Sequence, residues 1–183
     1  MRNLFHESQK AVLTLPPKND TEAETFSEWD FPDGLLNFDG QEFIFPAGFH
    51  ASAMSRWIEE GLLLVNITVS ANIEGECARC LAPANLEISG ELGYLYCSHS
   101  AEELEGFDDF MPVEVKNFGR VIDVMPQIRE SIYTLLPTKI LCREDCKGLC
   151  PVCGKNLNEG TCSCVNDDID PRLEALQNFS SEQ

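Results

Sequence analysis

Hydrophobic and polar side chains alternate most regularly between residues 63 and 73. Apolar residues occupy every second position of this run: Leu63, Val65, Ile67, Val69, Ala71 and Ile73. A period of two is typical of a strand with one buried face. A second run with the same period follows, through Leu86, Ile88, Leu92, Tyr94 and Tyr96. The two runs together predict a long antiparallel hairpin.

A helical period replaces the strand period near residue 123. Asp123 is the expected N-cap, and Pro126 is compatible with the first turn, where its missing N–H would have no partner. The predicted apolar stripe consists of Val124, Ile128, Ile132, Leu135 and Leu136, and Pro137 ends the helix. A second helix is predicted near the end of the chain, with Asp170 as N-cap and Pro171 at its first position.

Residues 18–40 show neither period. They are rich in Asp, Glu, Asn, Pro and Gly, and their aromatic residues are irregularly spaced. This composition predicts a long acidic loop, which either docks a basic partner or is fixed to the core of the protein by Trp29. Strand-like segments are expected at 42–45 and 111–116, and a turn or short helix at 51–60.

Together these elements predict an α+β fold, in which an antiparallel hairpin or sheet body with a few helices carries a cysteine-rich C-terminal lobe. The predicted parts are an acidic, poorly regular segment at 1–40, a sheet-plus-helix body at 41–140, and a zinc-binding lobe with a final helix at 141–183. A chain of 183 residues that is 43% hydrophobic can form a substantial core. It contains no apolar run near the roughly 20 residues of a membrane span.

Six of the nine cysteines lie close together near the C-terminus: Cys142, Cys146, Cys150, Cys153, Cys162 and Cys164. Cys150 and Cys153 flank a turn in which Pro151 presets φ and Gly154 permits a positive φ, as in a zinc knuckle. A tetrahedral ion needs a second pair of thiolates, which either Cys142 and Cys146 or Cys162 and Cys164 can supply. We therefore expect one structural zinc ion. An iron–sulfur cluster would also accept four cysteines, but the knuckle fits a single ion better.

Cys77 and Cys80 form a further pair at metal-ligand spacing, in the connection of the predicted hairpin. The pair is interpreted either as a partial site completed by the C-terminal cysteines or by a partner, or as a structural turn that exposes Arg79. In the partner reading, Cys77, Arg79 and Cys80 are candidate partner-binding residues. Cys97 follows Cys80 by seventeen residues, about 55 Å along an extended strand, so we expect it in the core.

The first ten residues are polar and lack the apolar region of a signal peptide. An odd number of cysteines also argues against a disulfide scaffold. The expected location is therefore the cytoplasm, or a compartment of similar redox poise.

The net charge of −18 is unevenly distributed. Residues 1–115 carry five Lys and Arg against twenty-one Asp and Glu, whereas residues 116–155 carry seven against four. Binding to a phosphate backbone requires clustered cations, and this chain offers few. The acidic body instead favours a basic protein partner.

The sequence contains little that predicts catalysis. His6, His50 and His99 are isolated, and there is no recognisable nucleophile setting or glycine-rich phosphate loop. Cys150 and Cys153 resemble a redox pair in spacing, but the strand-to-helix setting of thioredoxin is missing. We therefore expect a protein that is not an enzyme.

Several motifs in order resemble the YceD family, the large ribosomal RNA subunit accumulation proteins. They are Cys77-Ala-Arg-Cys80-Leu-Ala-Pro83, the helix at 121–137, the cysteine-rich segment at 142–164, and Asp170-Pro-Arg-Leu173. The resemblance covers residues 43–178, and residues before Gly40 depart from it. It implies a non-enzymatic role in making or stabilising large-subunit ribosomal RNA, in bacteria or plastids.

The expected function is therefore that of an assembly factor whose acidic surface binds a basic ribosomal protein or a large-subunit precursor. The Lys/Arg segment at 116–155 would make a secondary contact with RNA. The alternative is a direct RNA-binding zinc ribbon, which predicts affinity that falls steeply with salt. A thiol redox enzyme is a third class, and it would require a reactive cysteine of low pKa.

Overall fold

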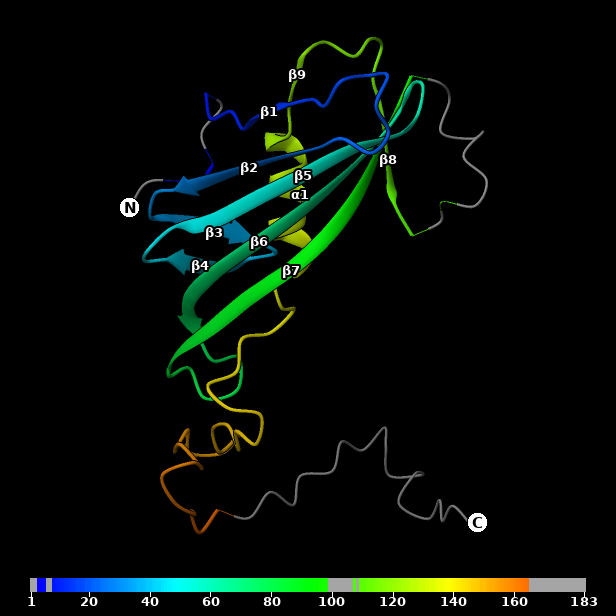
Figure 1. Ribbon diagram of the computed structural model, residues 1–183. Coiled ribbons are helices and arrows are strands. Elements are labelled where there is room, and N and C mark those ends of the chain that lie inside the picture. Colours follow the sequence, from blue (N-terminus) through cyan, green and yellow to red (C-terminus); the bar gives the residue numbers. More distant parts are fainter. Residues whose placement is uncertain (1–2, 6–7, 99–106, 108, 165–183) are drawn as a thin grey trace, which may run out of the picture.

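The structure is a computed structural model that describes residues 3–5, 8–98, 107 and 109–164. Within these ranges the chain forms nine strands and one helix (Figure 1). Their bounds are β1 Val12–Thr14, β2 Glu24–Phe31, β3 Gly34–Phe38, β4 Gln41–Phe45, β5 Phe49–Glu59, β6 Leu62–Glu76, β7 Pro83–Cys97, β8 Met111–Glu114, β9 Val121–Asp123 and α1 Met125–Leu135. The prediction of an α+β fold with a few helices was wrong, because the described chain is mainly β. The second predicted helix, from Asp170, lies outside the described residues.

A seven-stranded sheet forms the body of the molecule. β5, β6 and β7 are consecutive antiparallel neighbours, β2 pairs with β5, and β8 joins β7 in parallel. β4 meets β6 at Ile44 and Glu74, beyond the end of β5, and β3 pairs with β4. The register of β6 and β7 runs without interruption from Leu62 and Cys97 to Glu76 and Pro83, which confirms the predicted hairpin.

Helix α1 covers one face of this sheet and lies behind it in Figure 1. The Tyr94 hydroxyl lies 3.1 Å from Ser131 Oγ, and Leu135 lies directly over Gly90. The apolar positions of β6 that the period of two predicted are buried on this side. The helix begins one residue later than predicted, because Val124 is its N-cap; the Asp123 carboxylate still accepts a hydrogen bond from the Met125 N–H at 3.0 Å.

The prediction of an acidic loop at 18–40 was also wrong, since β2 and β3 occupy most of it. The period of β2 is hidden because its inward positions include small polar residues, Thr25 and Ser27, whereas Phe26 points outward and is 63% exposed. The segment at 51–60 is not a turn or short helix, because residues 51–59 belong to β5. Its inward side chains are mostly small, beginning with Ala51 and Ala53, and give a weak hydrophobic signal.

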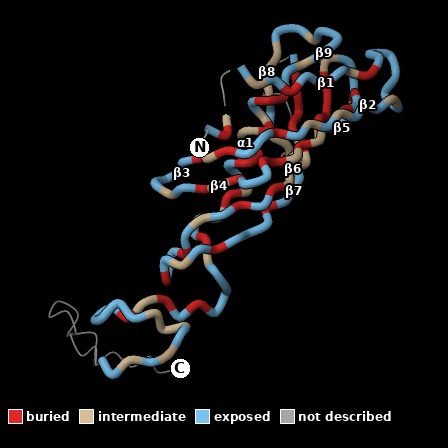
Figure 2. Tube along the Cα trace, turned by 90° about the vertical axis from the view of Figure 1, so that its left-hand side faces the viewer, coloured by how far each residue is buried: buried red, intermediate tan, exposed pale blue. Residues whose placement is uncertain are grey.

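Figure 2 shows buried residues concentrated in the sheet and a C-terminal lobe that is mainly exposed. Residues 151–155 of that lobe are all exposed. Within the described part of the chain, no helix has the length and the apolar character that a membrane crossing requires.

Candidate metal centres

Eight cysteines gather into two groups of four at the lower end of the molecule in Figure 1. Site 1 consists of Cys77, Cys80, Cys142 and Cys146. Site 2 consists of Cys150, Cys153, Cys162 and Cys164. The sulfur atoms of each group all lie within 4.8 Å of one another. The expectation of one metal site was therefore wrong, because the cysteines form two candidate sites and each of the two flanking pairs lies in a different one.

The sulfur spacing in site 1 matches a single tetrahedral ion. The Sγ atoms of Cys77 and Cys146 are 3.7 Å apart, and those of Cys80 and Cys142 are 3.6 Å apart. Zinc–sulfur bonds of about 2.3 Å in a tetrahedron place the sulfurs about 3.8 Å apart. A disulfide would need about 2.05 Å. A four-iron cluster would put each thiolate on a different iron, and so hold the sulfurs farther apart than one ion does.

Site 1 forms where the β6–β7 hairpin ends. The turn from Cys77 to Leu81 is closed by the Leu81 N–H, which donates to the Cys77 carbonyl at 2.9 Å. Beyond α1 the chain returns to this turn, where the Ala78 N–H donates to the Ile140 carbonyl at 2.8 Å. The buried Ile140 also packs against Gly75, where a larger residue would clash with it. The hairpin tip and the segment after the helix thus bring the two cysteine pairs together.

Arg79 connects the two halves of site 1. Its guanidinium donates to the carbonyls of Glu144 at 3.1 Å and Cys146 at 2.9 Å, and its own carbonyl accepts from the Leu149 N–H. The residue is exposed, as one interpretation of the sequence required, but its side chain is bound to the second half of the site. The contact of Arg79 with a partner stays a prediction.

Site 2 has the knuckle that the sequence predicted at Cys150. The Gly154 N–H donates to the Cys150 carbonyl at 2.9 Å, and Gly154 has a φ of 71°. The Cys150 N–H in turn donates to the Lys155 carbonyl at 2.8 Å. Cys150 is buried, whereas Cys153 and Cys164 are exposed. Site 2 therefore lies nearer the surface than site 1, in which Cys77, Cys80 and Cys146 are buried.

The loop between the ligand pairs of site 2 rests on site 1. The Asn158 amide donates to Cys146 Sγ at 3.3 Å. Its oxygen accepts from the Lys147 N–H at 2.8 Å and from the Arg143 guanidinium at 2.7 Å. In the sequence Asn158 appeared only as a turn-forming residue, because nothing local signals a contact twelve positions back.

The crowding of the thiols perturbs their pKa values in both directions. Burial raises the pKa of Cys77, but the backbone N–H groups of Cys142 and Arg79 outweigh it, and the pKa falls to about 6. Burial and the neighbouring Cys146 thiol raise the pKa of Cys142 to about 12. A dication bound between the sulfurs would favour the deprotonated form of all four.

The thiols of site 2 likewise divide into one with a lowered pKa and one with a raised pKa. Backbone N–H groups of Cys153 and Val152 lower the pKa of Cys150 to about 6. Hydrogen bonding with Cys153 and burial raise the pKa of Cys164 to about 12. Each site therefore contains thiols that ionise readily and others that need a cation to do so.

Cys97 belongs to neither group. It is buried with Leu62 and Leu95 at the opposite end of the hairpin, which confirms its predicted place in the core.

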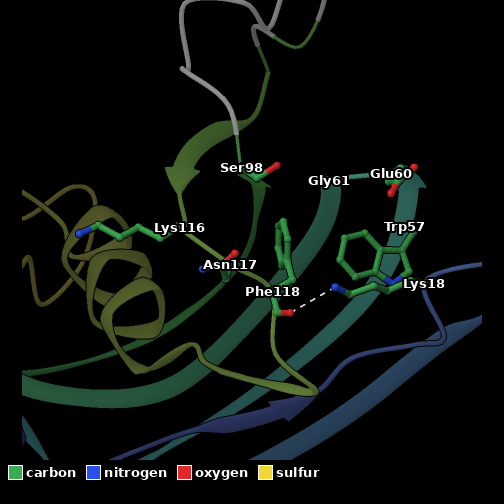
Figure 3. A pocket seen from close by; sticks show the side chains of 8 residues that line it. All are labelled: Lys18, Trp57, Glu60, Gly61, Ser98, Lys116, Asn117 and Phe118. Atoms are coloured by element: carbon green, nitrogen blue, oxygen red, sulfur yellow. Dashed lines mark hydrogen bonds between the residues drawn. The ribbon is translucent and has the colours of Figure 1, made fainter.

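A separate cavity of about 490 Å³ lies far from both sites, where Trp57 meets Phe118 (Figure 3). Lys18 reaches across it and donates to the Phe118 carbonyl at 3.2 Å. The lining combines two cations, Lys18 and Lys116, with the carboxylate of Glu60. In Figure 3 the Lys116 side chain points away from Trp57. The side chains that line the cavity therefore do not indicate one chemical class of ligand.

A model of the family described as large ribosomal RNA subunit accumulation protein YceD matches residues 65–180. The chain belongs to the YceD family. The matched range includes both cysteine groups and α1.

Curated relatives of this YceD protein include an uncharacterized protein of Mycobacterium tuberculosis, 34% identical over 123 residues, which are 65% of this chain and 56% of the relative. A second, from Mycobacterium leprae, is 32% identical over 96 residues, or 52% of this chain and 43% of the relative. A third is named large ribosomal RNA subunit accumulation protein YCED homolog 1, chloroplastic, from Arabidopsis thaliana. It is 32% identical over 71 residues, or 39% of this chain and 21% of the relative.

This chain spans just over half the length of the first of these relatives. No solved structure matches this chain.

Proposed function

We propose that this protein is a non-enzymatic factor that supports the accumulation of large-subunit ribosomal RNA. It acts by binding a basic ribosomal protein or a large-subunit precursor, and two structural zinc ions order its C-terminal lobe. The observation that carries this proposal is the family match across residues 65–180, which includes both cysteine groups.

Zinc is the ion that the two sites suit best. All candidate ligands are cysteine thiolates, which favour zinc over hard cations such as calcium or magnesium, and the sulfurs of each site lie within 4.8 Å of one another, close enough to share one ion. Four protein ligands would leave no open coordination position for a substrate, so the role of the ion would be structural. Residues 141–164 have few buried apolar side chains, and metal binding would supply the free energy that orders them.

The charge distribution favours a protein partner over bare RNA. The net charge of −18 repels phosphate, and large-subunit proteins are expected to be basic if they are to bind ribosomal RNA. Among the lobe cations, Arg143 already binds Asn158 and Lys155 already binds the Thr161 carbonyl. Lys147 is exposed and is the best placed for a secondary contact with RNA.

The alternative function is direct binding of RNA by the lobe as a zinc ribbon. The observation in its favour is the group of cations Arg143, Lys147 and Lys155 around the two sites. This alternative predicts tight binding of purified protein to bare ribosomal RNA, and a steep loss of affinity between about 50 and 200 mM salt.

The deciding experiment is affinity capture of the tagged full chain from cells of its source at moderate salt, with parallel RNase and mock treatments. Under the proposal, large-subunit ribosomal proteins are recovered in both arms. Their loss after RNase treatment would favour the alternative. Depletion of the protein should also reduce large-subunit ribosomal RNA relative to small-subunit RNA, and an unchanged ratio would contradict the proposal.

A further inference from the structure

The face of the sheet turned away from α1 carries a regular arrangement of polar side chains. This face is toward the viewer in Figure 1. In one cross-strand row, Glu28 on β2 and Glu91 on β7 flank Ser52 and Thr68 on the two central strands. In the next row, Asp30, His50, Ser70 and Ser89 stand side by side. In the first row two glutamates therefore border a floor of short hydroxyl side chains, and in the second Asp30 stands on the β2 side of a floor made by His50, Ser70 and Ser89.

Two neighbouring hollows continue this floor toward site 1. A cavity of about 230 Å³ is lined by Asp30, Ser70, Asn72 and Glu87, among others. A second, of about 680 Å³, is lined by Glu42, Ile44, Glu74, Glu76 and Leu81, among others. The hollows are adjacent because Asn72 pairs with Glu87 and Glu74 pairs with Asn85, two residues farther along the same hairpin. We call this surface, from Glu28 and Glu91 to Glu74 and Leu81, the acidic channel.

The width of the acidic channel suits one polypeptide segment. Three inter-strand steps separate β2 from β7, which at about 4.8 Å each amounts to about 14 Å. An α-helix with its side chains is about 10–12 Å across. A helix laid along the central strands would thus have an acidic row on each side.

Nearly all charged side chains on this face are acidic. Acidic side chains at outward positions are Glu24, Glu28, Asp30, Glu42, Glu74, Glu76, Glu87 and Glu91. The basic groups at outward positions of the same strands are Arg56 and His50, and the His50 ring lies 2.9 Å from Asp30. Such a surface repels nucleic acid and attracts cations along its whole length.

Exposed apolar side chains stand at both ends of the acidic channel. Phe26 is 63% exposed and pairs directly with Met54, which is 38% exposed. At the other end, Leu81 is 60% exposed beside the larger hollow, and it has a φ of 59°, which is unfavourable for leucine. Large apolar groups left in water around a charged groove are typical of a protein interface rather than of an ion site.

We propose that the acidic channel is the docking surface for a Lys/Arg-rich segment of a protein, with the dimensions of a single helix. The aliphatic stems of its lysines and arginines pack on the hydroxyl floor and on Ile44 and Leu81, while their charged ends meet the two acidic rows. This inference rests on the proposed function, because it identifies the surface that the basic partner contacts.

The test compares two triple variants that each remove three negative charges. The channel variant carries Asp30→Asn, Glu74→Gln and Glu87→Gln. The matched control carries Glu22→Gln, Glu130→Gln and Glu144→Gln, at exposed positions outside the channel. The probes are a synthetic Lys/Arg-rich helical peptide and a single-stranded RNA oligonucleotide of similar length, whose binding to the full chain is measured by fluorescence anisotropy.

The channel variant should bind the peptide about tenfold more weakly than the original protein, and the control less than twofold more weakly, because only the former loses local ion pairs. Circular dichroism and thermal melting establish that both variants are folded. Equal losses in the two variants, no loss in the channel variant, or tighter binding of RNA than of peptide would overturn the inference.

Affinity capture separates this inference from the proposed function. If the channel variant recovers large-subunit proteins as well as the original chain does, the channel is not the docking surface, although the proposed function stands. If the original chain recovers none, the proposed function itself fails, whatever the peptide result.

Discussion

The side-chain amide of Asn158 donates a hydrogen bond to the Cys146 sulfur at 3.3 Å. Asn158 lies between the ligand pairs of site 2, whereas Cys146 belongs to site 1. The same loop is held against site 1 by the Leu157 N–H, which donates to the Gly148 carbonyl at 2.9 Å. The two candidate metal centres are therefore linked through one loop, so we expect ordering of either site to favour the other.

Replacement of Asn158 should weaken metal binding at site 1 although Asn158 is no ligand. Asn158→Ala removes the donor to Cys146 and the acceptor for Lys147, and a loss of about 10- to 100-fold in affinity is expected for such a partner of a ligand. Chelator competition of the zinc-loaded protein measures this loss. Cobalt substitution reports the thiolate-to-metal bands of the site independently.

Asn158→Asp separates the two contributions. It keeps an acceptor for the Lys147 N–H but puts a negative oxygen beside the Cys146 sulfur. The affinity of this variant for zinc at site 1 should therefore fall as well. Metal affinities equal to that of the original protein in both variants would contradict the link between the sites.

Metal analysis of the purified protein should find two zinc ions per chain. Cys77→Ser should lose the ion of site 1 and Cys164→Ser that of site 2, because a structural site needs all four ligands. Cys97→Ala is the matched control, since Cys97 lies at the other end of the hairpin, and should retain both. Mass spectrometry of the intact protein counts the ions; a single ion in the original chain would refute the two-site arrangement.

Zinc affinity should fall steeply as the pH falls. Without metal at neutral pH, the pKa of Cys77 near 6 leaves this group ionised. Burial raises the pKa of Cys146, but hydrogen bonds from Asn158 and from the backbone N–H of Gly148 outweigh burial and lower it. The pKa of Cys142 near 12 and the raised pKa of Cys80 leave these groups protonated. Binding at site 1 therefore releases at least the two protons of Cys80 and Cys142, and the affinity should drop at least about hundredfold per pH unit between pH 8 and 7.

Below pH 6 the thiolate of Cys77 also takes up a proton, so the affinity for zinc falls still more steeply with falling pH. Calorimetry in buffers of different ionisation enthalpy counts the released protons, and chelator competition at several pH values gives the slope. Affinity that is independent of pH would contradict the assignment of thiolate ligands.

Arg79→Ala should loosen the lobe rather than the sheet. It removes two hydrogen bonds from a guanidinium to the carbonyls of Glu144 and Cys146, and since the residue is exposed we expect a loss of only about 1–2 kcal/mol. Hydrogen exchange should rise in residues 141–149 and stay unchanged in β5 and β6.

Arg56→Ala is the control for charge, because Arg56 is exposed on the outward face of the sheet. If Arg79→Ala leaves hydrogen exchange in the lobe unaltered but reduces recovery of large-subunit proteins, the side chain acts on a partner instead.

The sequence alone was sufficient for the parts of this protein that depend on local pattern. β6 follows from strict alternation, since it buries a continuous apolar face on the side of α1. β7 follows from a less regular alternation, in which Ile88, Tyr94 and Tyr96 are buried but Leu86 is 36% exposed. The knuckle at Cys150 follows from its proline and glycine. β2 and β5 could not be derived in this way, because small inward side chains and an outward Phe26 erase their period, and pairing with neighbouring strands determines them.

The composition of the metal sites was decided only by the tertiary structure. Cys77 and Cys146 are separated by 69 residues, and Cys80 and Cys142 by 62. Whether these cysteines meet depends on how far the hairpin extends and on where the chain returns to it after α1. The spacing of residues along the sequence encodes neither. The sequence showed that thiols were available for a metal, but the packing of the hairpin tip against the segment after the helix determined which four come close enough to share an ion.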